Sequence, residues 1–160
     1  MAYFSKLDSN NKVINSIRVE DDVVTQDGSF SEEKGQSFLR KIFNEPDAIW
    51  KRTVKGMRAG VNTNGGEVFR KNFGAIGTTY DEARDAFINQ DKVKNPDGTE
   101  CTTMIFNEDT CTWNYPIPKP TQVPISVWVY ADIGGWTRVD TRDENSVWEY
   151  DSVNGWVDKT

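Results

Sequence analysis

The chain has 160 residues and a formal net charge of −6, with 36% hydrophobic and 28% charged residues and no histidine. An acidic chain with scattered Lys and Arg lacks the basic stripe that neutralises phosphates, so we expect no nucleic-acid binding. No apolar run approaches the length of a membrane span, and MAYFSKLDSNN contains no basic stretch followed by an apolar one. We therefore expect no membrane insertion, and synthesis in a cytoplasm without a signal peptide.

The residue types needed for catalysis or metal binding are sparse. Without histidine the chain lacks the most common general base and zinc ligand. Cys101 and Cys111 fit no metal motif, and the predicted hairpin geometry places Cys111 in a turn and Cys101 on a strand, so we expect two free thiols. Acidic pairs such as Asp81 with Asp85 are explained as solvated turn charges. The sequence predicts a protein that is not an enzyme and binds no cofactor and no metal.

The first part of the chain predicts a hairpin and then a helix. Two β-prone runs flank Asp8–Asn11, whose side chains favour a turn. The segment SEEKGQSFLRKIFNE predicts a helix capped by Ser29 or Ser31, with an apolar stripe of Phe38, Leu39, Ile42 and Phe43. The following AIWKRTV predicts a strand.

Glycines mark the middle of the chain. Residues 55–66 are rich in Gly and Asn and predict a mobile loop. Gly74 and Gly77 do not precede the Lys-Ser/Thr of a phosphate-binding loop, so we interpret them as positions of close backbone approach.

One small pattern recurs four times: an aromatic residue, a short polar turn, and a second aromatic residue. We predict that each copy is a β-hairpin with its two rings facing each other, which also fixes the strand register. The most similar copies lie in VWVYADIGGW and VWEYDSVNGW. The four segments are Tyr80–Phe87, Phe106–Trp113, Tyr130–Trp136 and Tyr150–Trp156.

The two C-terminal hairpins contain the candidate partner-binding residues. Strand alternation places one group of side chains on one face of each hairpin. These faces either form the core of a small meander or present an aromatic platform to a protein or a sugar. The residues are Trp128, Tyr130, Trp136 and Arg138 in the first hairpin and Trp148, Tyr150 and Trp156 in the second.

The sequence as a whole predicts an α+β fold, mainly antiparallel β, with hairpins, one amphipathic helix and a C-terminal tandem hairpin element. Four prolines in YPIPKPTQVP predict an extended spacer. We therefore expect a mixed body over residues 1–115, a proline-rich spacer over 116–124 and an aromatic-rich module over 125–160.

Four segments of the N-terminal two-thirds carry a resemblance to a known group: MAYFSKLDSNNKVIN, SEEKGQSFLRKIFNEPDAIWKRT, NFGAIGTTYDEARDAFI and NEDTCTWNYPIP. Through them this part of the chain resembles small virion-associated proteins of tailed phages of marine bacteria, including cyanophages. The resemblance covers most of residues 1–117, and the appended hairpins, the 55–66 loop and Cys101 with its polar lead-in depart from it. It implies no catalytic residues; it implies a structural component of the particle, displayed on the capsid or at the tail.

The leading hypothesis is a capsid decoration or knob-like protein that is held by the major capsid protein of a virion. Either end of the chain could dock. A tail, neck or fibre component is one alternative. A carbohydrate-binding adhesion module that stacks exposed Trp residues on a host-surface glycan is the other.

Overall fold

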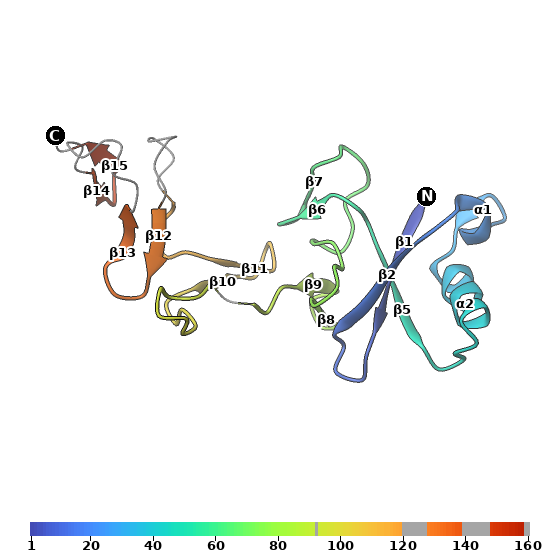
Figure 1. The fold of residues 1–160 in the computed structure, drawn as a ribbon. Helices are drawn as coiled ribbons and strands as arrows, with labels where there is room; N and C mark the ends of the chain where they lie inside the picture. The colour runs from blue at the N-terminus through green and yellow to red at the C-terminus, as the bar shows by residue number, and fades with distance from the viewer. Residues whose placement is uncertain (92, 120–127, 139–147, 159–160) are drawn as a thin grey trace. The chain divides into compact units, whose positions relative to one another are not determined.

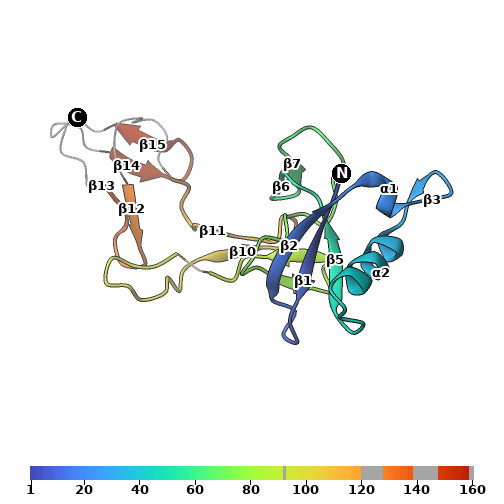
Figure 2. The same ribbon diagram turned by 45° about the vertical axis from the view of Figure 1, so that its right-hand side comes forward.

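The computed structural model of the protein describes residues 1–91, 93–119, 128–138 and 148–158 and divides the chain into two compact units. The first unit comprises residues 1–90 and 106–112, and the second comprises 91–105 and 113–160. Most elements are short antiparallel strands in small hairpin sheets, accompanied by two short helices (Figures 1 and 2). The predicted class, α+β and mainly antiparallel β, is confirmed.

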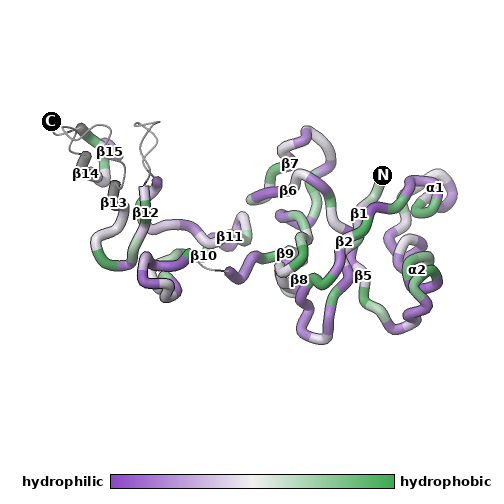
Figure 3. Tube along the Cα trace, in the orientation of Figure 1, coloured by the Kyte–Doolittle hydropathy of each residue, from purple (hydrophilic) through white to green (hydrophobic). Residues whose placement is uncertain are grey.

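The first unit is built around a three-stranded antiparallel sheet with the strand order β2-β1-β5. Its elements in chain order are β1 (Ala2–Leu7), β2 (Val13–Val19), α1 (Asp21–Val24), β3 (Thr25–Gln26), β4 (Ser29–Phe30), α2 (Glu32–Ile42), β5 (Ile49–Thr53), β6 (Met57–Arg58), β7 (Val61–Asn62), β8 (Thr79–Asp81) and β9 (Ala86–Ile88). Both hydrophobic and hydrophilic residues occur along the strands of this sheet (Figure 3).

The predicted N-terminal hairpin is confirmed. β1 pairs with β2 from Ala2↔Val19 to Leu7↔Val13. The Asp8 carboxylate accepts hydrogen bonds from the backbone N–H groups of Asn10 at 2.8 Å and Lys12 at 2.9 Å, so this side chain holds the turn closed.

The helices cover one face of the sheet, where Phe4 and Trp50 pack with Leu39 in the main core cluster. The predicted helix is confirmed as α2, and its cap is Ser31, whose hydroxyl accepts a hydrogen bond from the Lys34 N–H at 3.1 Å. The other predicted cap, Ser29, lies in β4.

The predicted apolar stripe of α2 is partly wrong. Ile42 and Phe43 are 58% and 41% exposed, although the Phe43 ring stacks on Trp50. Leu39 of the stripe is buried and Phe38 packs against the core, as predicted. The helix also buries Gly35, where a Cβ would collide with the Phe4 ring. A glycine carries no hydropathy signal, so the sequence pattern could not show that the helix approaches the sheet through this residue.

The opposite face of the sheet is covered by the chain that follows β5. Leu7 and Val13 pack there against Tyr80 and Phe87. Gly74 is bound directly to the sheet, because its carbonyl accepts from the Ser5 hydroxyl at 2.6 Å and its N–H donates to Thr53 Oγ1 at 2.8 Å. The predicted close approach at Gly74 is therefore confirmed, whereas an added Cβ at Gly77 would have nothing within 4 Å.

The segment 55–66, predicted as a loop, contains the hairpin β6–β7, paired as Met57↔Asn62 and Arg58↔Val61. Met57 is buried, and its carbonyl accepts from the Phe73 N–H at 2.9 Å. The Gly and Asn residues serve tight reversals here, since Gly56 and Gly60 both have positive φ.

The Arg70 guanidinium connects three elements of the first unit, and its side chain is only 9% exposed. Arg70 donates at 2.8 Å to Glu32 Oε1 of α2, at 2.8 Å to the Arg52 carbonyl of β5 and, from Nε, at 2.7 Å to Asp85 of the β8–β9 turn. Glu32 also accepts from the Arg52 N–H at 2.8 Å, so both outward backbone groups of Arg52 on this sheet edge are occupied by side chains.

The second unit contains the two C-terminal hairpins, and the chain passes between the units through β10–β11. Residues 106–112 of β10 (Ile105–Asn107), β11 (Thr112–Asn114) and the turn between them belong to the first unit. The strands of the second unit are β12 (Trp128–Ala131), β13 (Gly135–Arg138), β14 (Trp148–Asp151) and β15 (Gly155–Asp158). Cys111 lies in the β10–β11 turn with φ 52°, as predicted, whereas Cys101 precedes β10 and is not on a strand. Both thiols are free and buried.

The boundary between the units differs from the expected one at residue 115. Residues 91–105 belong to the second unit, and the Cys101 N–H donates to the Val93 carbonyl at 2.8 Å within it. Residues 116–119 of the expected spacer are described, and Ile117 packs on the aromatic cluster of this unit. Residues 120–124 lie outside the described part of the chain.

Replacing Gly74 with Ala tests the close approach. The added methyl would lie 2.8 Å from two Phe87 ring carbons and would collide with the Ser5 hydroxyl, so we expect a loss of about 2 kcal/mol in the stability of the first unit. Hydrogen exchange of peptides from residues 1–90 measures this loss. Gly66→Ala is the matched control, because its nearest neighbour is the Asn62 amide at 3.1 Å, and equal effects of the two substitutions would contradict the prediction.

Replacing Arg70 with Met tests the guanidinium connection. The change leaves Glu32 without its ion pair, and we expect the first unit to lose about 3 kcal/mol. Arg70→Lys keeps the charge but not the fork of donors, so it should recover only part of the loss. Urea unfolding followed by hydrogen exchange measures the three proteins, and a Met variant as stable as the wild type would show that the connection is dispensable.

Candidate functional site

The two C-terminal hairpins share one geometry. In the first, Tyr130 is paired with Trp136 across β12 and β13, and their ring centroids are 5.4 Å apart. In the second, Tyr150 is paired with Trp156 across β14 and β15 at 5.6 Å. The predicted cross-strand ring pairs are confirmed here, and Tyr80↔Phe87 in the first unit is a third example, at 5.2 Å.

The aromatic rings of the first hairpin lie in a hydrophobic core. Trp128, Tyr130 and Trp136 are buried, and this aromatic cluster also includes Cys101 and Met104. Tyr115 packs against it with ring centroids 4.9 Å from Tyr130 and 4.4 Å from Trp136. The rings of this hairpin therefore supply the interior of the second unit.

The second hairpin contacts the first through Trp156, whose ring lies 5.4 Å from that of Trp128. The indole N–H of Trp136 donates to the Ile117 carbonyl at 2.8 Å, and that of Trp156 donates to the Pro118 carbonyl at 2.9 Å. Equivalent indoles of the two repeats thus donate to neighbouring carbonyls of one segment, Ile117 and Pro118.

The predicted partner-binding residues are not equally accessible. Trp128 and Trp136 are only 9% and 8% exposed, and Tyr130 is buried, whereas Tyr150 and Trp156 are partly buried. Arg138 pairs with Trp128, and Trp148 pairs with Asp158, in the backbone register. The side chains of Arg138 and Trp148 lie outside the described part of the structure. Whether these seven residues bind a partner stays a prediction.

The turn of the first hairpin is held by Asp132. Its Oδ2 accepts from the Thr102 N–H at 2.6 Å, and its Oδ1 accepts from the Thr103 N–H at 3.0 Å; both hydroxyls also donate to the same carboxylate. These hydrogen bonds, with that from the Thr102 N–H the strongest, hold the pKa of Asp132 well below its usual range. The Asp132 N–H donates in turn to Asn95 Oδ1 at 2.9 Å.

The Asp132 contacts were not predicted from the sequence. An aspartate in a hairpin turn is common, and nothing local indicates that its partners lie near residue 100. The Thr103 hydroxyl lies 2.7 Å from the Tyr130 hydroxyl, so the turn, this segment and the aromatic pair form one hydrogen-bonded assembly.

Beside this assembly lies a groove of about 500 Å³ between the 95–102 segment and the turn of the first hairpin. Ile133 forms part of its wall and is 93% exposed. Val153 occupies the same position in the second turn and is 87% exposed. Both tandem hairpins therefore present a β-branched apolar side chain to solvent at their tips.

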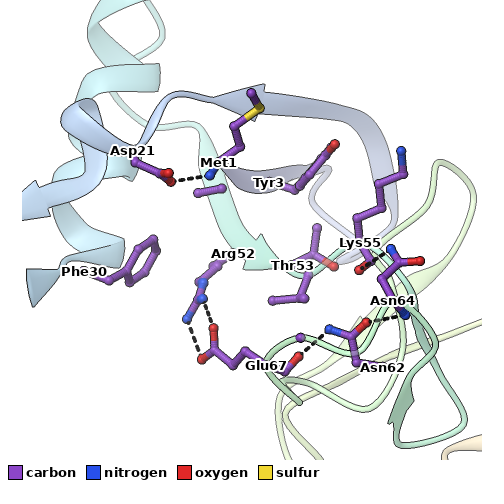
Figure 4. A pocket seen from close by; sticks show the side chains of 13 residues that line it. Met1, Tyr3, Asp21, Phe30, Arg52, Thr53, Lys55, Asn62, Asn64 and Glu67 are labelled. Atoms are coloured by element: carbon purple, nitrogen blue, oxygen red, sulfur yellow. Dashed lines mark hydrogen bonds and ion pairs between the residues drawn. The ribbon is translucent and has the colours of Figure 1, made fainter.

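A second cavity, of about 310 Å³, lies in the first unit, where β1 begins and β5 ends (Figure 4). The Arg52 guanidinium forms one side and is paired with Glu67. Phe30 lies against the same guanidinium, 3.9 Å from its central carbon to the ring centroid. Lys55 and Tyr3 also line the cavity, and their side chains end in an ammonium group and a phenol hydroxyl.

Asp81 and Asp85, which we interpreted from the sequence as solvated turn charges, have different environments. Asp81 accepts from the Arg84 N–H at 2.9 Å and is a turn residue, as expected. Asp85 instead binds Arg70 and the Tyr80 hydroxyl, and burial together with this hydrogen bond raises the pKa of Tyr80 to about 12. Tyr80 therefore stays protonated and serves as a structural donor.

Within the described residues, no three His, Cys, Asp or Glu side chains are grouped so that they could hold a metal ion. None of the described helices has the length and apolarity needed to cross a membrane. Models of known protein families, curated protein sequences and solved structures give no match to this chain.

Replacing Asp132 with Asn tests the turn contacts through their pH dependence. The folded-state pKa lies below the unfolded value of about 3.9, so the carboxylate stabilises the second unit above that pH and the contribution is lost as the pH falls towards the folded-state pKa. We expect Asp132→Asn to lower the melting temperature at pH 7, and the difference from the wild type to shrink towards pH 3. Asp109→Asn, an exposed turn residue, is the control, and a difference that is constant with pH would argue against the ionised carboxylate.

Proposed function

We propose that this chain is a non-enzymatic structural protein of a bacteriophage particle, a decoration or knob-like protein bound to the major capsid protein. The sequence resemblance over residues 1–117 supports the assignment to a phage particle. The exposed hairpin turns of the second unit support an adhesive role. Made in the host cytoplasm, the protein would end up in the virion.

One observation carries the adhesive role. Ile133 and Val153 stand at the same position in two copies of one hairpin and are almost fully exposed. An exposed aliphatic side chain contributes little to the folded chain by itself, whereas burying it against a partner contributes about 1.5–3 kcal/mol. Its presence at the tip of both repeats favours a contact surface formed by the turns.

The rings have a supporting role in this proposal. Because Trp128 and Trp136 are buried in the aromatic cluster, they fix the hairpins and leave the turns to meet the capsid protein. Trp156 and Tyr150 are partly buried and can add to the contact from the second hairpin. The groove beside Ile133 would receive a side chain of the capsid protein.

A carbohydrate-binding module is the second candidate, since the partly buried Trp156 leaves some indole surface accessible. The small exposure of Trp128 and Trp136 weighs against sugar stacking on those two rings. Titrating intrinsic tryptophan fluorescence with polysaccharides separates the candidates, because a bound glycan would shift the emission and a capsid-binding protein would show none.

The copy number of the protein in purified particles tests the location. Quantitative mass spectrometry should find on the order of hundreds of copies for a protein that repeats with the capsid lattice, and about six or twelve for a tail or neck component. Absence of the protein from purified particles would refute the proposal as a whole.

The double substitution Ile133→Ser and Val153→Ser tests the turn surface. Both positions are exposed, so folding should be unaffected, while affinity for the capsid should fall by roughly thirtyfold for each side chain that is buried on binding. Occupancy of particles assembled with the variant measures the effect. Ile76→Ser in the first unit, at a position 68% exposed, is the control, and normal occupancy of the double variant would exclude the turns as the contact.

A further inference from the structure

The cavity in the first unit has the size of a small-ligand site. At about 310 Å³ it lies at the lower end of the range for pockets that enclose small molecules. It forms where Tyr3 at the start of β1 faces Thr53 at the end of β5, and Lys55 follows two positions later. The Tyr3 ring is fixed by an edge contact with Phe73, with centroids 6.0 Å apart, so this wall is set by packing.

The residues that line the cavity carry one more positive charge than negative charges. Glu67 is paired with the Arg52 guanidinium, and Asp21 is paired with the amine of Met1 (Figure 4). Lys55 has no ion-pair partner among the residues that the structure describes, and only its backbone carbonyl is engaged, by the Asn64 amide at 3.3 Å. The lining therefore carries one unneutralised positive charge.

Two further groups of the lining residues are available to a ligand, a hydroxyl and an aromatic ring. The Tyr3 hydroxyl forms no hydrogen bond within the described part of the chain, although the ring is partly buried. Phe30, on the Arg52 side of the cavity, is 41% exposed and presents an aromatic ring. Lys55, Tyr3 and Phe30 are thus three lining residues of a single cavity with groups that the fold leaves available (Figure 4).

From these residues we infer that the cavity binds a monocarboxylate that carries an apolar or aromatic group. The carboxylate accepts hydrogen bonds from the Lys55 ammonium and the Tyr3 hydroxyl, and the apolar group packs against Phe30. A monoanion matches the single surplus charge. A dianion such as a phosphate ester would meet Glu67 and Asp21 with an uncompensated charge.

The same chemistry is offered by a free aryl carboxylic acid and by the C-terminal carboxylate of a peptide that ends in an aromatic residue. Phenylacetate is the probe for the free acid, and a short peptide ending in phenylalanine is the probe for the peptide terminus. Their neutral controls are phenylacetamide and the same peptide with an amidated C-terminus.

Titration of the ¹⁵N-labelled full chain, followed by amide chemical shifts, tests the inference. We expect either carboxylate probe to shift the amides of Tyr3, Thr53 and the 62–66 segment, and the neutral controls to shift none of them. The probe that binds more tightly identifies the source. No shift with either carboxylate, or equal shifts with the neutral controls, overturns the inference.

Two substitutions identify the groups that bind. Lys55→Met keeps the aliphatic stem and should weaken binding about tenfold, and Tyr3→Phe keeps the ring and should weaken it about threefold. Lys12→Met removes an exposed lysine elsewhere in the same unit and should change nothing. Because Lys55 is exposed, its variant should fold as the wild type does, and unchanged affinity in Lys55→Met overturns the assignment.

Discussion

The structure depends most on one interaction, an aromatic pair that closes a short β-hairpin. It occurs as Tyr80↔Phe87 in the first unit and as Tyr130↔Trp136 and Tyr150↔Trp156 in the second. An isolated two-stranded hairpin is marginal in water, and a ring pair contributes roughly 0.5–1.5 kcal/mol beyond the area it buries while excluding a shifted register. Such pairs lie in the cluster of Tyr80 and Phe87 and in the aromatic cluster of the second unit, whereas the main core of the first unit is formed by Phe4, Trp50 and Leu39.

The pairs of the two units are stabilised by different surroundings. In the first unit the Tyr80 hydroxyl binds Asp85, which also binds Arg70, so the pair is connected to the helix and the sheet by charge-assisted hydrogen bonds. In the second unit the partners are other rings, the Thr103 hydroxyl beside that of Tyr130, and the carbonyls of Ile117 and Pro118, which accept from indole N–H groups. Ionic contacts therefore connect the pair of the first unit to its surroundings, and tilted or edge-on rings with neutral hydrogen bonds surround the pairs of the second.

Local signals predicted much of this fold. Asp8–Asn11, the Ser31 cap and the alternation of Tyr130 and Trp136 each act within a few residues, and the structure has the corresponding turn, helix and ring pair. The features that the sequence missed act across long separations. Asp132 meets Thr102 and Thr103, and Arg70 meets Glu32, through contacts that leave no periodic pattern in the chain.

The candidate site shows the same limit. The sequence identified the tandem hairpins, but it could not distinguish rings that form a core from rings that form a platform, because both uses require the same alternation. In the first hairpin Trp128 and Trp136 are buried, and only the structure could show this. The cavity near Lys55 had no sequence signal, since it forms only where β1 meets the end of β5.

For the adhesive role that we propose, the contacts that hold the hairpin tips in place matter. Association costs the entropy of every side chain and loop that must be ordered, about 0.5–1.5 kcal/mol for each mobile side chain. The ring pair at the base of each turn holds the two strands together, and the positive φ of Gly135 and Gly155 fits the chain reversal. In the first turn, Asp132 is also hydrogen-bonded to the backbone of Thr102 and Thr103. Ile133 and Val153 are β-branched and have few rotamers to lose. Two apolar side chains held in this way can use most of their burial energy for adhesion, which a flexible loop of the same composition could not do.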